Sequence, residues 1–329
     1  MADRMRQELH DPILIVGAPR SGTTWLAKII DSHPDVLYRH EPDDGHIDAC
    51  PITPSDVPRL MAQWAADRTP RAAAKRPFFP KSYQSAWQRN VRTLLVGAIS
   101  AAARLPPPLR NIRHLPVPDM MAQPPPRVAI KSIRLAEKTT VFAAAEPACR
   151  VVFILRHPCG QVASVMRGNR QQRFELKTAG TDMPFDEAAA IRFAAGSGVT
   201  DARFQALSDA AKYAWSWRAF NEPACAALSG LQNVRIVCYE TLCAAPEAEA
   251  RRILAFCALP WNLQTQDFIS RSTTHKGDPG YYAIFRNAVA AAAAWQTTMP
   301  PDDQQAVQAV LAGSPLAHYW QGLGQVITR

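Results

Sequence analysis

A short glycine-containing turn between an apolar run and a helical pattern constrains this chain more than any other feature. The run Ile13–Val16 is continuous and ends at Gly17, which is typical of a buried parallel strand. Residues 18–24 form a turn rich in glycine, proline and serine, and residues 25–30 follow with apolar side chains at helical spacing. Pro34 then ends the helix. The segment predicts a strand, a glycine loop and a helix in direct succession.

Further strands and helices alternate along the chain. Apolar runs at 128–130, 150–155 and 234–239 predict strands, with Lys131 and Ser132 at the end of the first of these. The segments that predict helices are 55–66, 83–103, 160–167, 213–228 and 246–257. Alternation of this kind predicts an α/β fold, with a mostly parallel central sheet and helices on both faces.

Composition places the chain among globular proteins, since 47% of its 329 residues are hydrophobic and 20% are charged. No uncharged apolar run reaches the roughly 20 residues of a spanning helix, and the start of the chain has no apolar stretch of secretory type. The seven cysteines match neither a disulfide framework nor a zinc site. We therefore expect a cytoplasmic protein with no membrane span and no metal. The net charge of +9 suits anionic partners.

The glycine loop is suited to hold an anion, because N–H groups of such a loop and of the next helix converge on one point. Gly17, Gly22 and Thr24 match the Walker A pattern G-x-x-x-x-G-K-[ST], but Thr23 stands where that pattern has its lysine. A cation occurs three positions earlier, as Arg20. A P-loop kinase or other nucleotide-dependent phosphotransferase is therefore an alternative that this loop supports poorly.

The segment Pro19–Leu26, with the sequence PRSGTTWL, resembles the 5′-phosphosulfate loop of sulfotransferases that use 3′-phosphoadenosine 5′-phosphosulfate (PAPS) as donor. This resemblance implies a P-loop-like sulfotransferase fold and sulfuryl transfer to a hydroxyl, leaving adenosine 3′,5′-bisphosphate (PAP). It implies that Arg20 holds the sulfuryl group and that Trp25 touches the adenine, unless Trp25 is a core residue of the helix. The residues implied for the 5′-phosphate are Ser21, Gly22, Thr23 and Thr24.

A second set of residues resembles the 3′-phosphate site of the same family. Arg156 ends a predicted strand, Pro158 follows two positions later, and Ser164 lies eight positions after the arginine. An arginine fork suits a phosphate dianion, and a serine hydroxyl adds a directed donor. The resemblance further implies that Tyr239 contacts the nucleotide and that Arg286, in a loop that closes over the donor, contacts the 3′-phosphate.

The acceptor hydroxyl needs a base to take its proton. The Lys-Thr-His unit of cytosolic sulfotransferases corresponds to Lys131–Ile133 here, so their histidine is missing. Residues 33–42 instead resemble tyrosylprotein and carbohydrate sulfotransferases. That resemblance implies Glu41 as the base, with Arg20 and Lys131 stabilising the leaving phosphate. The reserve candidates for the base are His40 and His46.

These features together predict one sulfotransferase domain over residues 1–329, with a proline-rich insertion at about 42–126 that helps to shape the acceptor pocket. The acceptor is expected to be a small molecule or a glycan, and a carbohydrate, a lipid, a small metabolite and a peptide tyrosine all remain open. A non-catalytic basic protein that binds nucleic acid or sulfated polymers is a further alternative. It would need basic runs or aromatic-rich basic patches, so we expect no nucleic-acid partner.

Overall fold

The computed structural model describes residues 10–43, 51–102, 104–106, 108–121, 127–135, 138–170, 186–274 and 287–320. At its centre is a five-stranded sheet in the order β2-β3-β1-β4-β5, and every neighbouring pair runs parallel. The strands are β1 Ile13–Val16, β2 Val36–His40, β3 Arg127–Ser132, β4 Arg150–Leu155 and β5 Val234–Cys238. The predicted α/β fold with a parallel central sheet is confirmed.

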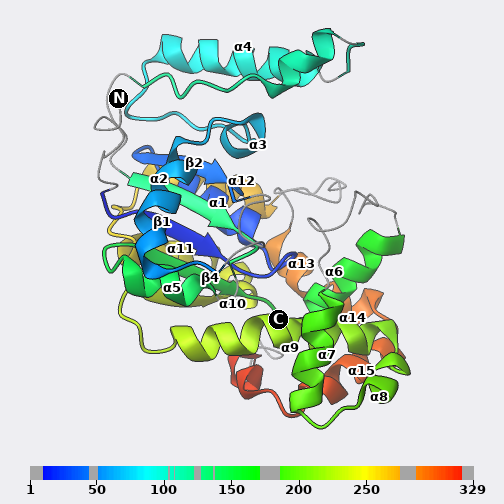
Figure 1. Cartoon of the computed structure of the whole chain (residues 1–329). Helices are drawn as coiled ribbons and strands as arrows, with labels where there is room; N and C mark the ends of the chain where they lie inside the picture. Colours follow the sequence, from blue (N-terminus) through cyan, green and yellow to red (C-terminus); the bar gives the residue numbers. More distant parts are fainter. Residues whose placement is uncertain are drawn as a thin grey trace.

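Helices cover both faces of the sheet, as Figure 1 shows. Along β1, Ile13 and Ile15 belong to one hydrophobic core, and Leu14 and Val16 belong to the other, because successive side chains of a strand point to opposite faces. The helices of the first face are α1 Thr23–Asp31, α10 Tyr239–Ala244, α11 Pro246–Phe256, α12 Leu263–Thr274 and α13 Ala288–Ala293. Those of the second face are α2 Val57–Ala66, α5 Thr139–Ala145 and α9 Asp209–Leu228. Burial on both faces explains the uninterrupted apolar sequence of β1.

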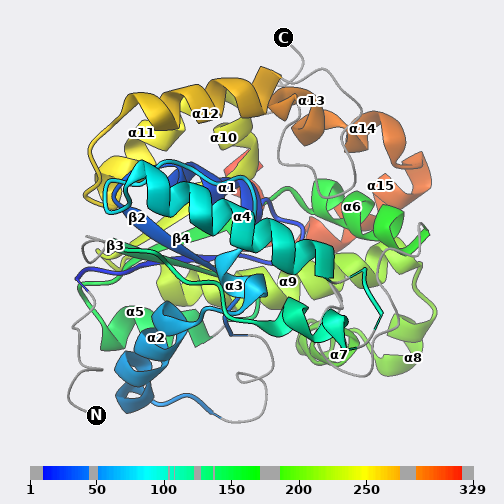
Figure 2. The same ribbon diagram turned by 90° about the horizontal axis from the view of Figure 1, so that it is seen from above.

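The remaining helices lie outside these two layers, in two groups (Figures 1 and 2). On the β2 side these are α3 Pro70–Ala73, which contacts β2, and α4 Ala86–Ala102, which lies farther out. A second group is joined to α9 through contacts of α6, α7 and α15. It contains α6 Pro158–Arg170, α7 Glu187–Gly196, α8 Asp201–Gln205, α14 Trp295–Thr298 and α15 Pro301–Leu311. Short 3₁₀ helices are Pro54–Asp56, Leu109–His114 and Pro315–Trp320.

β2 is a strand that the sequence pattern did not predict, since it carries Arg39 and His40 beside its apolar residues. The structure buries Arg39, and an ion pair satisfies its charge, with one guanidinium nitrogen 2.7 Å from Asp119 Oδ2. The Nε group of Arg39 donates to the carbonyl of Ala65 at 2.8 Å. A buried cation needs such partners, and both come from distant parts of the sequence. A local pattern therefore cannot reveal this strand.

The predicted helices overlap α2, α4, α6, α9 and α11. α9 begins earlier than predicted because Ser208 caps it, its Oγ accepting from the Ala211 N–H at 3.3 Å. α7 and α8 were not predicted, since their polar and alanine-rich sequence has no clear apolar period. No helix in the described part of the chain is long and apolar enough to cross a membrane. The expected single domain with an insertion at about 42–126 stays a prediction.

Candidate functional site

The loop after β1 turns tightly at the carboxyl end of the sheet, where α1 begins. Gly22 caps α1 with φ 99° and ψ 7°, in the left-handed region that favours glycine. A Cβ at Gly22 would lie 2.5 Å from Cδ2 of Tyr239, so a side chain at this position is also excluded sterically. Arg20 has a positive φ as well, of 70°. The Tyr239 ring therefore packs directly against the backbone of the loop.

Arg156 and Ser164 reach this loop from two other elements. Arg156 follows β4, and its NH1 group donates to the carbonyl of Arg20 at 2.8 Å. Ser164 lies in α6, and the Nε group of Arg20 donates to its Oγ at 3.1 Å. The guanidinium of Arg156 lies over the ring of Tyr239, 4.7 Å from its centroid. The structure thus brings together residues that the sequence analysis assigned to two separate phosphate sites.

Several donors at this point have no partner among the residues that the structure describes. The N–H groups of Thr23 and Thr24, at the start of α1, have no acceptor within the helix, whereas those of Trp25 and Leu26 donate to the carbonyl of Gly22. Ser21 Oγ and Arg156 Nε are buried and make no hydrogen bond in the described part of the chain. Buried polar atoms without a partner are rare in folded proteins. The helix dipole adds positive potential at the same place, so the site is suited to an anion with several acceptor oxygens.

Trp25 and Arg286 are the other predicted nucleotide contacts. Trp25 is only 8% exposed and belongs to the core between the sheet and α12. Its Nε1 group donates to Ser272 Oγ at 3.1 Å, and its ring meets Tyr239 edge to face with centroids 6.2 Å apart. The side chain anchors α1, and its contact with a nucleotide stays a prediction. Arg286 lies outside the described residues.

A second polar cluster surrounds Glu41, which directly follows β2 and has φ 48°. The Glu41 N–H donates to the carbonyl of Lys131 at 2.8 Å, which places it beside the end of β3. The Lys131 ammonium forms an ion pair with Oε1 of Glu41, and an Arg71 guanidinium nitrogen lies 3.0 Å from Oε2. His40 Nε2 lies 3.8 Å from Oε1. The carboxylate is therefore held by two cations, one at each oxygen.

These neighbours set the ionisation of the cluster. Burial alone would raise the pKa of Glu41, but the charge of Lys131 and the hydrogen bonds from Lys131 and Arg71 outweigh it and lower that pKa to about 2. Burial, with the Lys131 charge, lowers the pKa of His40 to about 2. Burial also lowers the pKa of Lys131, against the opposing charge of Glu41. Near neutral pH Glu41 is therefore ionised and His40 is neutral.

Arg71 and Asp43 belong to this cluster but were not predicted from the sequence. Arg71 comes from α3, and no local pattern links it to Glu41. Asp43 accepts a hydrogen bond from Ser132 Oγ, and burial raises the pKa of Asp43. Its spacing, two residues beyond Glu41 at the end of a strand, is the signal that could have revealed it. His46, a reserve candidate for the base, lies outside the described residues.

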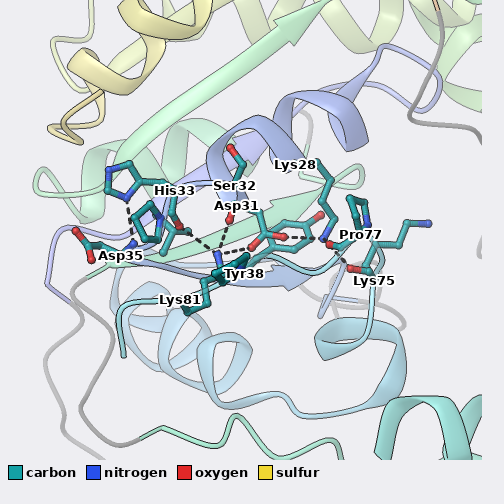
Figure 3. Close-up of polar contacts among 12 residues, drawn as sticks. Lys28, Asp31, Ser32, His33, Asp35, Tyr38, Lys75, Pro77 and Lys81 are labelled. Atoms are coloured by element: carbon teal, nitrogen blue, oxygen red, sulfur yellow. Dashed lines mark hydrogen bonds and ion pairs between the residues drawn. The ribbon is translucent and has the colours of Figure 1, made fainter. Parts of the chain in front are cut away.

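A buried charge cluster ties α1 to the chain beyond α3 (Figure 3). Lys28 Nζ, on α1, lies 2.6 Å from Asp31 Oδ2. It also donates to the carbonyls of Lys75 and Pro77, at 2.6 and 3.1 Å. Lys81 Nζ lies 2.9 Å from the other oxygen of Asp31. α1, the helix that begins at the glycine loop, is thus fixed against the segment that follows α3.

Solved sulfotransferase structures are similar to this chain at low sequence identity. The mouse sulfotransferase SULT7A1 complexed with PAP is 13% identical, with 96% of this chain and 89% of that chain covered and a TM-score of 0.45. Sulfotransferase STF9 from Mycobacterium avium is 14% identical, with 97% of this chain and 78% of that chain covered and a TM-score of 0.45.

A family model gives the decisive comparison. No curated protein sequence matches the chain. Residues 12–262 match the model described as the sulfotransferase family, and this span contains both polar clusters. The match does not favour the phosphotransferase alternative, and the closer resemblance to tyrosylprotein and carbohydrate members stays a prediction. Because the match covers well over half of its length, the chain belongs to the sulfotransferase family.

Proposed function

We propose that this chain transfers the sulfuryl group of PAPS to an acceptor hydroxyl, with Glu41 as the general base. The observation that supports this most is that Arg156 and Ser164 each lie within hydrogen-bond distance of Arg20, in the loop after β1. A donor with phosphates at both its 5′ and its 3′ position uses both sets of residues. A nucleoside triphosphate would leave the second set of residues without a role. Its binding would also call for the Walker A lysine, and this chain has Thr23 at that position.

The residues present fit a bisphosphate nucleotide. Ser21 Oγ and Arg156 Nε are buried donors without a partner among the described residues, and phosphate oxygens would satisfy both. The loop and the first turn of α1 suit the 5′-phosphate. Arg156 and Ser164 suit the 3′-phosphate. When bound, PAPS supplies a sulfuryl group joined to a phosphate that leaves as an anion.

Arg20 and Lys131 are the cations that we assign to the charge on the leaving phosphate. Arg20 lies in the loop itself and is oriented by its Nε bond to Ser164. Lys131 is the penultimate residue of β3, the strand next to β1, and is held by its ion pair with Glu41. By analogy with phosphoryl transfer, positioning and charge stabilisation should do most of the catalytic work.

Glu41 takes the proton of the acceptor hydroxyl in this proposal. Lys131 and Arg71 fix its two oxygens and keep it ionised near neutral pH. The same cations make it a weak base, since a pKa of about 2 lies far below the optimum for a base that works near pH 7. Proton transfer should therefore be late, when the hydroxyl oxygen is already bonding to sulfur and has become acidic. The acceptor side includes α3, because Arg71 reaches Glu41 from it.

Calorimetric binding of PAP, compared with ATP plus magnesium, tests the donor assignment. We expect magnesium-independent binding of PAP that Arg156→Ala weakens by about 1.5–3 kcal/mol, the scale of a charged hydrogen bond. Arg167→Ala is the matched control, because Arg167 is an exposed arginine of α6 and should not affect PAP affinity. Binding of ATP with magnesium only would overturn the proposal. Transfer assays with carbohydrate, lipid, metabolite and tyrosine-peptide acceptors then identify the acceptor class.

A further inference from the structure

The peptide unit that joins Arg156 to His157 is held at both of its polar atoms. Trp217, on α9, donates from Nε1 to the carbonyl of Arg156 at 3.1 Å. The N–H of His157 donates to Oε1 of Glu240, on α10, at 3.1 Å. Because a peptide unit is planar and rigid, two bonds from side chains of different helices fix its orientation. The direction in which Arg156 leaves β4 is fixed with it.

Glu240 is itself held from several sides, although it is only 1% exposed. Its Oε2 accepts from Trp320 Nε1 at 3.0 Å and from the thiol of Cys238 at 3.3 Å. Burial, together with the charge of Glu240, raises the pKa of Cys238 to about 12, so the thiol keeps the proton that it donates. With the His157 N–H, three neutral donors hold the carboxyl group. Its position is therefore well determined.

Aromatic rings enclose the residue that follows Arg156. The His157 ring stacks on Trp295, with centroids 4.6 Å apart and planes 8° apart, and Trp320 meets it edge-on at 5.4 Å. Burial, with the Arg156 charge, lowers the pKa of His157 to about 4, so the ring is neutral near pH 7. With the backbone and the next side chain fixed, the Arg156 guanidinium is directed toward the carbonyl of Arg20.

We infer that Glu240 and Trp217 are positioning residues for Arg156, and that they aim its guanidinium at the 3′-phosphate of the donor. The inference rests on the proposed function, because it takes Arg156 as the ligand of that phosphate. The two side chains act through the peptide unit after Arg156. An arginine fork recognises a phosphate only in a narrow range of orientations. Loss of either bond should therefore weaken 3′-phosphate recognition and leave the 5′-phosphate loop intact.

The ratio of the dissociation constants of adenosine 5′-monophosphate (AMP) and PAP measures this recognition, because the two nucleotides differ only in the 3′-phosphate. We expect Trp217→Phe and Glu240→Leu to lower the ratio about tenfold or more, with AMP affinity within about twofold of wild type. Glu240→Gln should keep most of the ratio, since its amide oxygen can accept from the His157 N–H. In an Arg156→Ala background, neither change should lower the ratio further.

Trp320→Phe is the matched control, because it removes a donor to Glu240 but leaves both bonds of the peptide unit. An unchanged ratio in Trp217→Phe and Glu240→Leu, with a lower one in Arg156→Ala, would overturn the inference and leave the proposed function standing. An equal loss in Trp320→Phe would also overturn it, since packing alone would explain the effect. An unchanged ratio in Arg156→Ala would show that the 3′-phosphate assignment itself is wrong. Trp217→Phe keeps the test available if Glu240→Leu does not fold.

Discussion

The carboxylates of Glu41 and Asp43 lie two residues apart but have opposite environments. Glu41 faces a cation at each oxygen, which lowers its pKa to about 2 despite burial. Asp43 receives a hydrogen bond from Ser132, and burial raises its pKa. At the scale of single residues, we therefore compare Glu41 and Asp43 as candidates for the general base. Its contact with Lys131 favours Glu41.

Glu41→Gln should lower turnover by at least about 10²-fold, within the usual range for loss of a general base, and should not weaken PAP binding. Asp43→Asn is the matched control, since it removes a neighbouring carboxylate but leaves the ion pair of Glu41 with Lys131. Its turnover should stay within about tenfold of wild type. Sulfate-transfer assays and calorimetry give the two quantities. Wild-type turnover in Glu41→Gln would sink the assignment of the base.

The pH dependence of kcat provides a second test of Glu41. A base works only when deprotonated, and a pKa of about 2 means that Glu41 loses its proton-accepting form only as the pH falls toward 2. At saturating donor and acceptor, kcat should therefore show no acid limb between about pH 5.5 and 8. A histidine with its ordinary pKa of about 6.5 would give a limb in that range. Such a limb, persisting in Glu41→Gln, would move the assignment to His46.

At the scale of elements, the cluster of Lys28, Asp31 and Lys81 is the tie between α1 and the segment after α3. Asp31→Asn leaves two buried ammonium groups without their counter-charge. Removing one partner of a buried ion pair typically costs about 3–5 kcal/mol. We expect a loss of that size in the free energy of unfolding, measured by urea denaturation.

The control for this prediction is Glu247→Gln on α11. Glu247 forms an exposed i,i+4 pair with Arg251, at 2.7 Å, and such pairs contribute only about 0.3–0.5 kcal/mol. A similarly small loss in Asp31→Asn would mean that water reaches the cluster and that it does not fix α1.

The elements also show what sequence patterns can predict. β1, β3 and β4 contain buried apolar runs, and β5 is largely apolar although its first three residues are only half-buried. The positions of these strands can therefore be predicted from the local sequence, and so can the residues at their ends. Arg156 and Lys131 could be placed for this reason. β2 could not, because its buried Arg39 depends on Asp119, 80 residues away. The partners of the site residues, such as Arg71 and Trp217, depend on tertiary contacts in the same way.

At the scale of the whole molecule, the proposed donor site consists of residues from distant parts of the chain. Its residues follow β1 and β4 or lie on α6 and α10, and they meet at the carboxyl end of the sheet. A ligand that binds only when these elements are assembled stabilises the folded state, by about 2.7 kcal/mol at 100 times its Kd. PAP should therefore raise the Tm of the whole chain by several degrees.

Arg156→Ala should abolish most of this rise at the same PAP concentration. A loss of about 1.5–3 kcal/mol in affinity brings that concentration down to between about 0.6 and 8 times Kd, where stabilisation is only about 0.3–1.3 kcal/mol. Arg167→Ala should keep the full rise, since Arg167 is exposed on α6. Differential scanning calorimetry gives the Tm values. Equal rises with AMP and PAP in wild type would contradict a 3′-phosphate site, because the donor would then be held by the 5′-phosphate loop alone.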